Sequence, residues 1–147
     1  FPKLVPGMAF FDSVESFSLI RGGHIDVTVL GALQVSRTGD LANWIIPKRG
    51  LGSIGGAMDL AANAKRVVIA MEHTARGNTP KIVEECTFPL TAPGCVDEIV
   101  TDIAVIKIDR VSGRMILRET APGWSFEDVQ ALTEATLVVD GEIVEIS

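Results

Sequence analysis

The chain has 147 residues and carries 19 acidic against 13 basic side chains, a formal net charge of −6. Binding to nucleic acid needs a surplus of lysine and arginine, so this charge argues against a nucleic-acid-binding protein. The hydrophobic content of 47% argues against a disordered chain, and no apolar run approaches the roughly 18 residues of a membrane-spanning helix. We therefore expect one domain over residues 1–147, or most of one, with no nucleic-acid or membrane partner.

Helices and strands alternate in the first half of the chain. In order, the sequence predicts a helix over 12–20, a strand over 25–30, a short strand over 43–46, a helix over 57–65 and a strand over 67–71. Asp12 or Ser13 can cap the first helix, and Gly22–Gly23 ends it. The strands over 25–30 and 67–71 are apolar and β-branched, which is typical of strands buried on both faces.

The second half of the chain is richer in predicted strands. In order, we expect an extended segment over 82–86, a helical turn over 96–100, strands over 103–108 and 114–119, a helix over 125–134, and short strands over 136–139 and 143–146. Ser112–Gly113 supplies the turn of a hairpin, and Ser125 with Asp128 has the spacing of a capping box. Helices that alternate with apolar strands predict an α/β fold built on a mixed sheet.

Two cysteines, Cys86 and Cys95, are the candidates for thiol chemistry. They have no second cysteine pair and no clustered histidines, so the spacing of a metal site is absent. We interpret them as two reduced thiols of a cytoplasmic protein that binds no metal.

A glycine-rich loop precedes the helix predicted over 57–65 and allows three interpretations. Residues 50–55 match the dinucleotide-binding pattern G-x-G-x-x-G, with Glu72 about 20 residues further on, but Pro47 rather than a strand leads into the first glycine. The glycines can also serve only a tight turn and close helix packing. Third, Gly55-Gly56-Ala57 at a helix start can present backbone N–H groups to an anion or to the oxyanion of an acyl-transfer intermediate.

Several segments resemble one known family. They are 20–26 (IRGGHID), 40–47 (DLANWIIP), 54–60 (IGGAMDL), 71–73 (MEH), 86–91 (CTFPLT) and 101–105 (TDIAV). In this order and at this spacing they resemble the B subunit of the 3-oxoacid CoA-transferases, of the succinyl-CoA:3-ketoacid and 3-oxoadipate type. The resemblance covers nearly the whole chain. It implies an open, mixed, mostly parallel sheet flanked by helices, the architecture of family I CoA-transferases.

The resemblance also implies a reaction. In the family a glutamate attacks an acyl-CoA, and an enzyme-bound CoA thioester then passes CoA to a second carboxylic acid. Carried over by motif, Gly56 and Ala57, with Gly55 beside them, face the oxyanion and the CoA thiol. Asn43, on the loop leading to the glycines, is a further candidate for ligand contact. Coenzyme A is then a substrate, and no other cofactor is implied.

The nucleophile of the family is not found in this chain. It lies in a Glu-Asn-Gly motif upstream of the matching region, and no glutamate of this sequence is followed by Asn-Gly. Because the chain also starts at Phe1, we expect the C-terminal two-thirds of a B-type subunit, inactive alone. Its expected partners are an A subunit and the missing N-terminal segment, and its surface should be more apolar than its length needs. Ser53 and Ile54 depart from the residues usual in the family's glycine loop.

Two alternatives remain beside a transferase. The first is a non-catalytic binding or assembly domain that has kept the fold and its glycine loop. The second is a nicotinamide-binding domain, which would require Gly50 to end a strand and Glu72 to contact a ribose. Glu72 and His73 also invite interpretation as an acid–base pair, but neighbouring side chains on a strand point to opposite faces, which favours structural roles.

Overall fold

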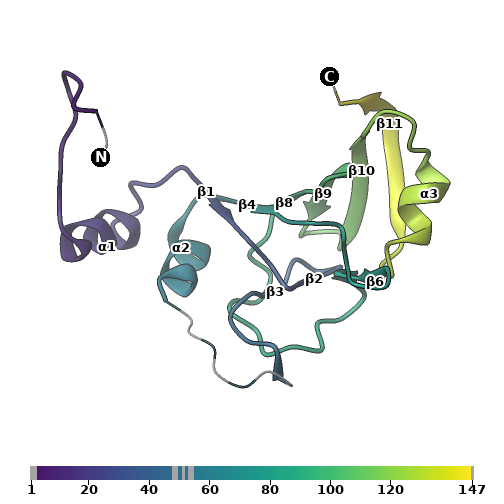
Figure 1. Ribbon diagram of the computed structural model, residues 1–147, viewed down its shortest axis with the longest axis horizontal. Helices are drawn as coiled ribbons and strands as arrows, with labels where there is room; N and C mark the ends of the chain where they lie inside the picture. The colour runs from purple at the N-terminus through teal and green to yellow at the C-terminus, as the bar shows by residue number, and fades with distance from the viewer. Residues whose placement is uncertain (1–2, 48–49, 51, 53–54, 147) are drawn as a thin grey trace.

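The structure, a computed structural model, describes residues 3–47, 50, 52 and 55–146. Its largest element is a six-stranded sheet (Figure 1). In spatial order the strands are β1 (Val27–Leu30), β4 (Arg66–Ala70), β8 (Glu98–Val100), β9 (Ala104–Asp109), β10 (Arg114–Thr120) and β11 (Leu137–Glu145). The helices are α1 (Ser13–Arg21), α2 (Ala57–Asn63) and α3 (Phe126–Ala131).

Parallel and antiparallel pairs divide this main sheet. β1, β4 and β8 run parallel to one another, β9 is antiparallel to both β8 and β10, and β11 is again parallel to β10. The α/β class and the mixed, mostly parallel sheet predicted from the sequence are therefore confirmed. The hairpin predicted around Ser112–Gly113 is the β9–β10 pair.

A second, smaller layer packs against one face of the main sheet. It consists of the three-stranded sheet β3 (Leu41–Ala42), β2 (Gln34–Ser36) and β7 (Ile82–Val83), and a short hairpin of β5 (Thr74–Ala75) and β6 (Thr79–Pro80) follows β4. Val35, Leu41 and Ile82 of the small sheet share one core with the main sheet, and their side chains are fully buried. In Figure 1 this layer and α2 lie below the main sheet.

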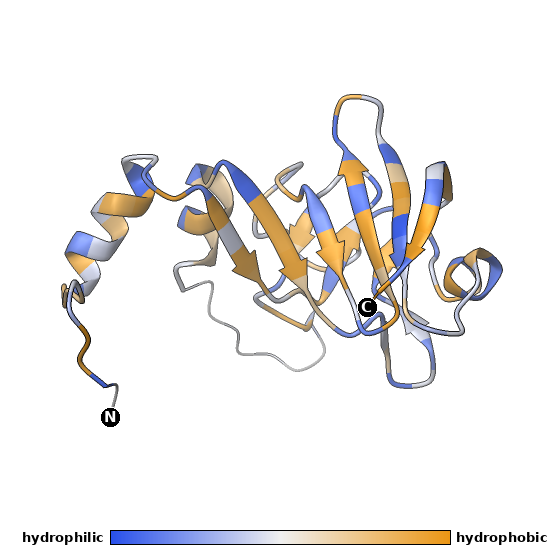
Figure 2. Ribbon diagram, turned by 90° about the horizontal axis from the view of Figure 1, so that it is seen from above, coloured by the Kyte–Doolittle hydropathy of each residue, from blue (hydrophilic) through white to orange (hydrophobic). Residues whose placement is uncertain are grey.

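The opposite face of the main sheet is open. Figure 2, which looks down on that face, shows α1 and α3 at the two sides and no described helix in front of the strands. The strand predicted over 25–30 was expected to be buried on both faces, and this expectation is wrong for the chain by itself. Val27 and Val29 are 51% and 62% exposed, because β1 is an edge strand and nothing described covers its outer face.

Three further predictions are corrected by the pairing of the strands. Residues 96–100, expected as a helical turn, contain β8, which lies between β4 and β9 with Ile99 fully buried. The short strand expected over 43–46 is instead β3, which pairs with β2 two residues earlier in the chain. The two terminal strands are one strand, β11, whose register shifts part-way along β10.

The predicted capping box at α3 is confirmed and gives a test of local stability. The Ser125 side chain accepts from the Asp128 backbone N–H, and the Asp128 carboxylate accepts from the Ser125 backbone N–H. We expect Ser125→Ala to lower the free energy of unfolding by about 1 kcal/mol, since an N-cap side chain is lost. Urea denaturation measures the change. Ser125→Thr, which keeps a cap, should lose much less, and an equal loss in both variants would contradict the assignment.

Candidate functional site

The carboxyl ends of β1 and β4 form the candidate site. These two strands are parallel and adjacent, and α2 connects them in the chain, so the loop after β1 and the start of α2 lie at the same edge as the end of β4. Ligands of open α/β sheets bind at this edge. A pocket of about 390 Å³ lies there, with apolar walls from Leu33, Ile46 and Phe88 and charged groups from Glu72 and Lys81.

The predicted Gly-Gly-Ala segment forms the first turn of α2. Gly55 has a φ of +52°, which favours glycine, Gly56 is the residue before the helix, and Ala57 is its first residue. Within the described part of the chain, no side chain caps this end of the helix. Ser53 and Ile54, which depart from the family pattern, lie outside the described residues.

Gly56 also has a packing role. A Cβ atom at this position would lie 2.8 Å from Cζ of Phe17 on α1, closer than real contacts allow. Arg21 of α1 donates to the Asp59 carboxylate of α2, with Nε and Oδ1 2.8 Å apart, and the same guanidinium lies over the Phe17 ring. The glycine and the ion pair therefore hold α1 against α2, as the interpretation of close helix packing predicts.

The remaining glycines of the G-x-G-x-x-G pattern have local causes too. Gly50 has a φ of +73°, and a Cβ at Gly52 would lie only 2.2 Å from the backbone oxygen of Trp44. Gly50 lies in no strand. The condition stated for a nicotinamide-binding domain, a strand ending at Gly50, is therefore not met.

Asn43 is fixed by internal hydrogen bonds. Its side-chain nitrogen donates to the Gly31 backbone oxygen at 3.1 Å, and its side-chain oxygen accepts from the Thr91 hydroxyl at 2.7 Å. The residue thereby ties the loop after β1 to the loop after β3. One hydrogen of the amide nitrogen is not used by these two bonds.

Glu72 and His73 point in opposite directions, as predicted from strand geometry. Glu72 is exposed at the pocket, whereas His73 is 1% exposed. The His73 ring lies between two hydroxyls, with Nδ1 3.0 Å from Oγ1 of Thr101 and Nε2 2.9 Å from Oγ1 of Thr133. Burial lowers the pKa of His73, and the Asp102 carboxylate opposes this only in part. A buried, doubly bonded neutral imidazole is a structural group, not an acid–base catalyst.

Lys81 is the residue of the pocket that sequence reasoning missed. It lies immediately before β7 and reaches the carboxyl edge of β4 only because β7 pairs with β2. Burial lowers the pKa of its ammonium, opposed by the Glu72 and Asp102 carboxylates. No local pattern around residue 81 marks this position, so the sequence carried no signal for it.

Neither thiol is poised for reaction. Burial raises the pKa of Cys86 to about 12 and that of Cys95 to about 11, so both stay protonated near neutral pH. Both are free cysteines, as predicted. Among the residues that the structure describes, no group of three histidine, cysteine or acidic side chains could hold a metal ion. No helix in this part of the chain has the length and apolar character needed to cross a membrane.

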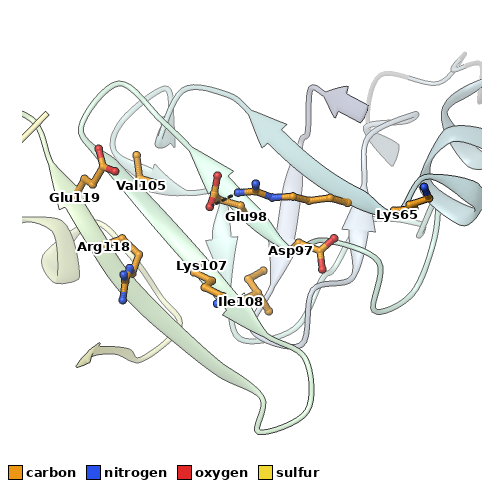
Figure 3. Close-up of a pocket in the computed structure, with 9 residues that line it drawn as sticks. Lys65, Asp97, Glu98, Val105, Lys107, Ile108, Arg118 and Glu119 are labelled. Atoms are coloured by element: carbon orange, nitrogen blue, oxygen red, sulfur yellow. Dashed lines mark hydrogen bonds and ion pairs between the residues drawn. The ribbon is translucent and has the colours of Figure 1, made fainter. Parts of the chain in front are cut away.

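A larger hollow, of about 690 Å³, lies on the open face of the main sheet (Figure 3). Its charged side chains come from neighbouring strands and pair with one another: Arg66 donates to the Glu98 carboxylate at 2.8 Å. None of the predicted site residues lines it. Paired charges on an open surface bind ligands weakly, so the candidate site remains the carboxyl edge.

Comparison with known proteins identifies the family. The model of the family described as coenzyme A transferase matches residues 3–132. The chain belongs to the coenzyme A transferase family. Two relatives are the beta chain of a probable coenzyme A transferase of Bacillus subtilis, 49% identical over 94% of this chain, and the human mitochondrial succinyl-CoA:3-ketoacid coenzyme A transferase 2, 48% identical over 92% of it.

The solved structures agree on the fold of this coenzyme A transferase chain. The acyl-CoA transferase YdiF of Escherichia coli O157:H7 superposes on 95% of the chain with a TM-score of 0.82, at 21% sequence identity. The chain covers 31% of that protein, 63% of the Bacillus subtilis subunit and 26% of the human enzyme. It therefore spans somewhat under two thirds of the subunit that it matches, and its site is part of a larger one.

Proposed function

We propose that this chain is part of a coenzyme A transferase that moves CoA between an acyl-CoA, such as succinyl-CoA, and a 3-oxoacid. The transfer passes through a glutamyl-CoA thioester, and the glutamate comes from outside these 147 residues. The observation that carries the proposal is the 49% identity to one chain of a coenzyme A transferase over 138 residues, which include the glycine loop.

In this proposal the Gly55-Gly56-Ala57 segment receives the reacting carbonyl and the CoA thiol. The backbone N–H groups at the start of α2 have no side-chain cap among the described residues, and small residues let a thioester approach them closely. Asn43 holds the adjacent loop and offers its second amide hydrogen to the ligand. Coenzyme A enters as a substrate, and the mechanism needs no further cofactor.

The proposed assembly is a heteromer. Relatives that match over more than nine tenths of this chain are named as the beta or B component of a transferase with more than one kind of subunit, which supports a companion A subunit. The two free thiols, Cys86 and Cys95, fit the reducing cytoplasm. The pocket at the carboxyl edge is then one wall of a site that the companion subunit completes.

An assay of CoA transfer from succinyl-CoA to acetoacetate tests the function. We expect no transfer by the 147-residue chain alone, because the nucleophile is absent. We expect transfer once the chain is fused to the unmatched third of a subunit relative and combined with that relative's companion subunit. Mass spectrometry should then find CoA on a glutamate outside this chain. Transfer by the isolated chain would overturn the proposal.

A non-catalytic binding or assembly domain is the second candidate. The packing of Phe17 on Gly56 favours it, because this contact explains the glycine without a ligand. The same reconstitution separates the two: an assembly domain would restore a heteromer of the expected mass that transfers no CoA.

A further inference from the structure

The free edge of β1 lacks the features that protect edge strands. β1 pairs with β4 on one side, and on its other side no described strand pairs with it. Its four residues, Val27–Leu30, include no charge and no proline, and its register with β4 contains no bulge. Natural edge strands are normally blunted by one of these, since a flat, uncharged edge recruits other strands. β1 has the character of an interior strand.

The outer face of β1 leads to the same conclusion. Val27 and Val29 are more than half exposed, and Val29 lies beside Val68 of β4 on the open face. Parallel sheets occur almost only where both faces are covered, and their strands are apolar for that reason. In Figure 2 these strands are largely orange, and no described helix lies in front of them.

The helix next to β1 exposes apolar side chains as well. Phe10, Phe11 and Val14 are 69%, 53% and 72% exposed, and α1 is held to the rest of the chain mainly through α2. Figure 1 places this arm at the β1 end of the molecule, while the C-terminus lies at the other end. Exposed apolar surface is therefore concentrated at one end of the fold, and patches of this kind mark interaction sites.

We propose that β1 is an interior strand of a wider sheet, and that its free edge pairs with polypeptide from the part of the subunit that this chain does not match. The Bacillus subtilis relative is 138 matched residues at 63% of its length, which leaves about 80 residues for this role. That length is enough for two or three strands with a covering helix. The inference needs the family relationship and this length, not the transfer reaction.

A second copy of the chain fits the edge less well. A two-fold axis would pair β1 antiparallel with itself, whereas β1 belongs to the parallel part of the sheet. Four paired residues bury far less than the roughly 1,200 Å² of a stable interface. An added segment of about 80 residues can cover the edge, the outer face and the α1 arm together.

Coexpression with that segment tests the inference. The 147-residue chain is produced with the unmatched third of the Bacillus subtilis relative as a separate tagged polypeptide, and mass and hydrogen exchange are measured. We expect a 1:1 complex in which the amides of 27–30 exchange at least about tenfold more slowly than in the isolated chain. Val29→Lys should leave the melting temperature of the isolated chain within about 2 °C and prevent the complex, because the lysine charge would be buried.

Val144→Lys is the matched control. Val144 is a valine on the opposite edge strand, β11, and is 58% exposed against 62% for Val29. The complex should form with this variant, and Val27→Lys should repeat the effect of Val29→Lys. The inference is overturned if no complex forms, if both lysine variants on β1 bind normally, or if the isolated chain forms a dimer that protects 27–30.

Discussion

Replacing His73 by alanine should lower the free energy of unfolding by about 3 kcal/mol at pH 8. The imidazole is fully buried between the Thr101 and Thr133 hydroxyls, so the substitution removes two hydrogen bonds and leaves a cavity. Thr133 donates its own hydrogen to the Val129 backbone oxygen, which makes Nε2 of His73 the donor in their contact. Urea denaturation of the wild type and the variant measures the loss.

The same histidine predicts how stability depends on pH. Burial lowers the folded-state pKa of His73 below its ordinary 6.5, so below pH 6.5 the unfolded chain binds a proton that the folded chain refuses. The contribution of His73 is therefore complete above pH 6.5 and is lost as the pH falls toward the folded pKa. The carboxyl groups with lowered pKa values, such as Asp59 and Asp128, act only below about 3.8.

His73→Gln separates the two effects. Glutamine is polar and does not titrate, so the variant should keep part of the stability at pH 8 and show a smaller loss between pH 7 and pH 5 than the wild type. The measurement is a series of urea midpoints across this range. Equal slopes in the two proteins would show that His73 is not the group that titrates.

Gly56→Ala should have the largest effect on activity in the assembled enzyme. The added Cβ would lie 2.8 Å from the Phe17 ring and would narrow the approach to the start of α2. Loss of an oxyanion donor costs about 100- to 1,000-fold in kcat, and we expect a loss of this order in the CoA-transfer assay. The displaced Phe17 ring should also cost about 1–2 kcal/mol of stability.

Phe17→Leu distinguishes the packing role of Gly56 from its proposed site role. The smaller side chain makes room for the new Cβ, so the double variant with Gly56→Ala should regain stability. Its activity should stay low, because the Cβ still lies at the carbonyl-binding position. Phe17→Leu alone should retain activity. Recovery of activity in the double variant would leave Gly56 as a packing residue only.

Local signals in the sequence were sufficient for some elements. Ser125 and Asp128 form a capping box within four residues, and Asp12 caps α1 through its bond to the Glu15 backbone N–H. A missed local signal is Gly77–Asn78, where both residues have positive φ and turn the hairpin between β5 and β6. Such a pair is typical of a type I′ turn and could have been recognised.

Other features depend on partners that are distant in the chain. β8 has no helical or extended signal of its own that outweighs its short length, and it is a strand because β4 and β9 flank it. The positions of Gly56 and of the buried His73 could be anticipated from motif and strand geometry. The contact of Phe17 with Gly56 and the place of Lys81 in the pocket arise only when α1 meets α2 and β7 meets β2.

The parallel pairing of β1 with β4 also sets an order of events during synthesis. Val27–Leu30 leaves the ribosome first, and its partner Arg66–Ala70 follows only after the whole of residues 31–65. By contrast, β9 and β10 are joined by a short turn and can pair as soon as both have emerged. We expect the β9–β10 hairpin to form early on its own, while the apolar β1 waits unpaired and most needs protection by a chaperone.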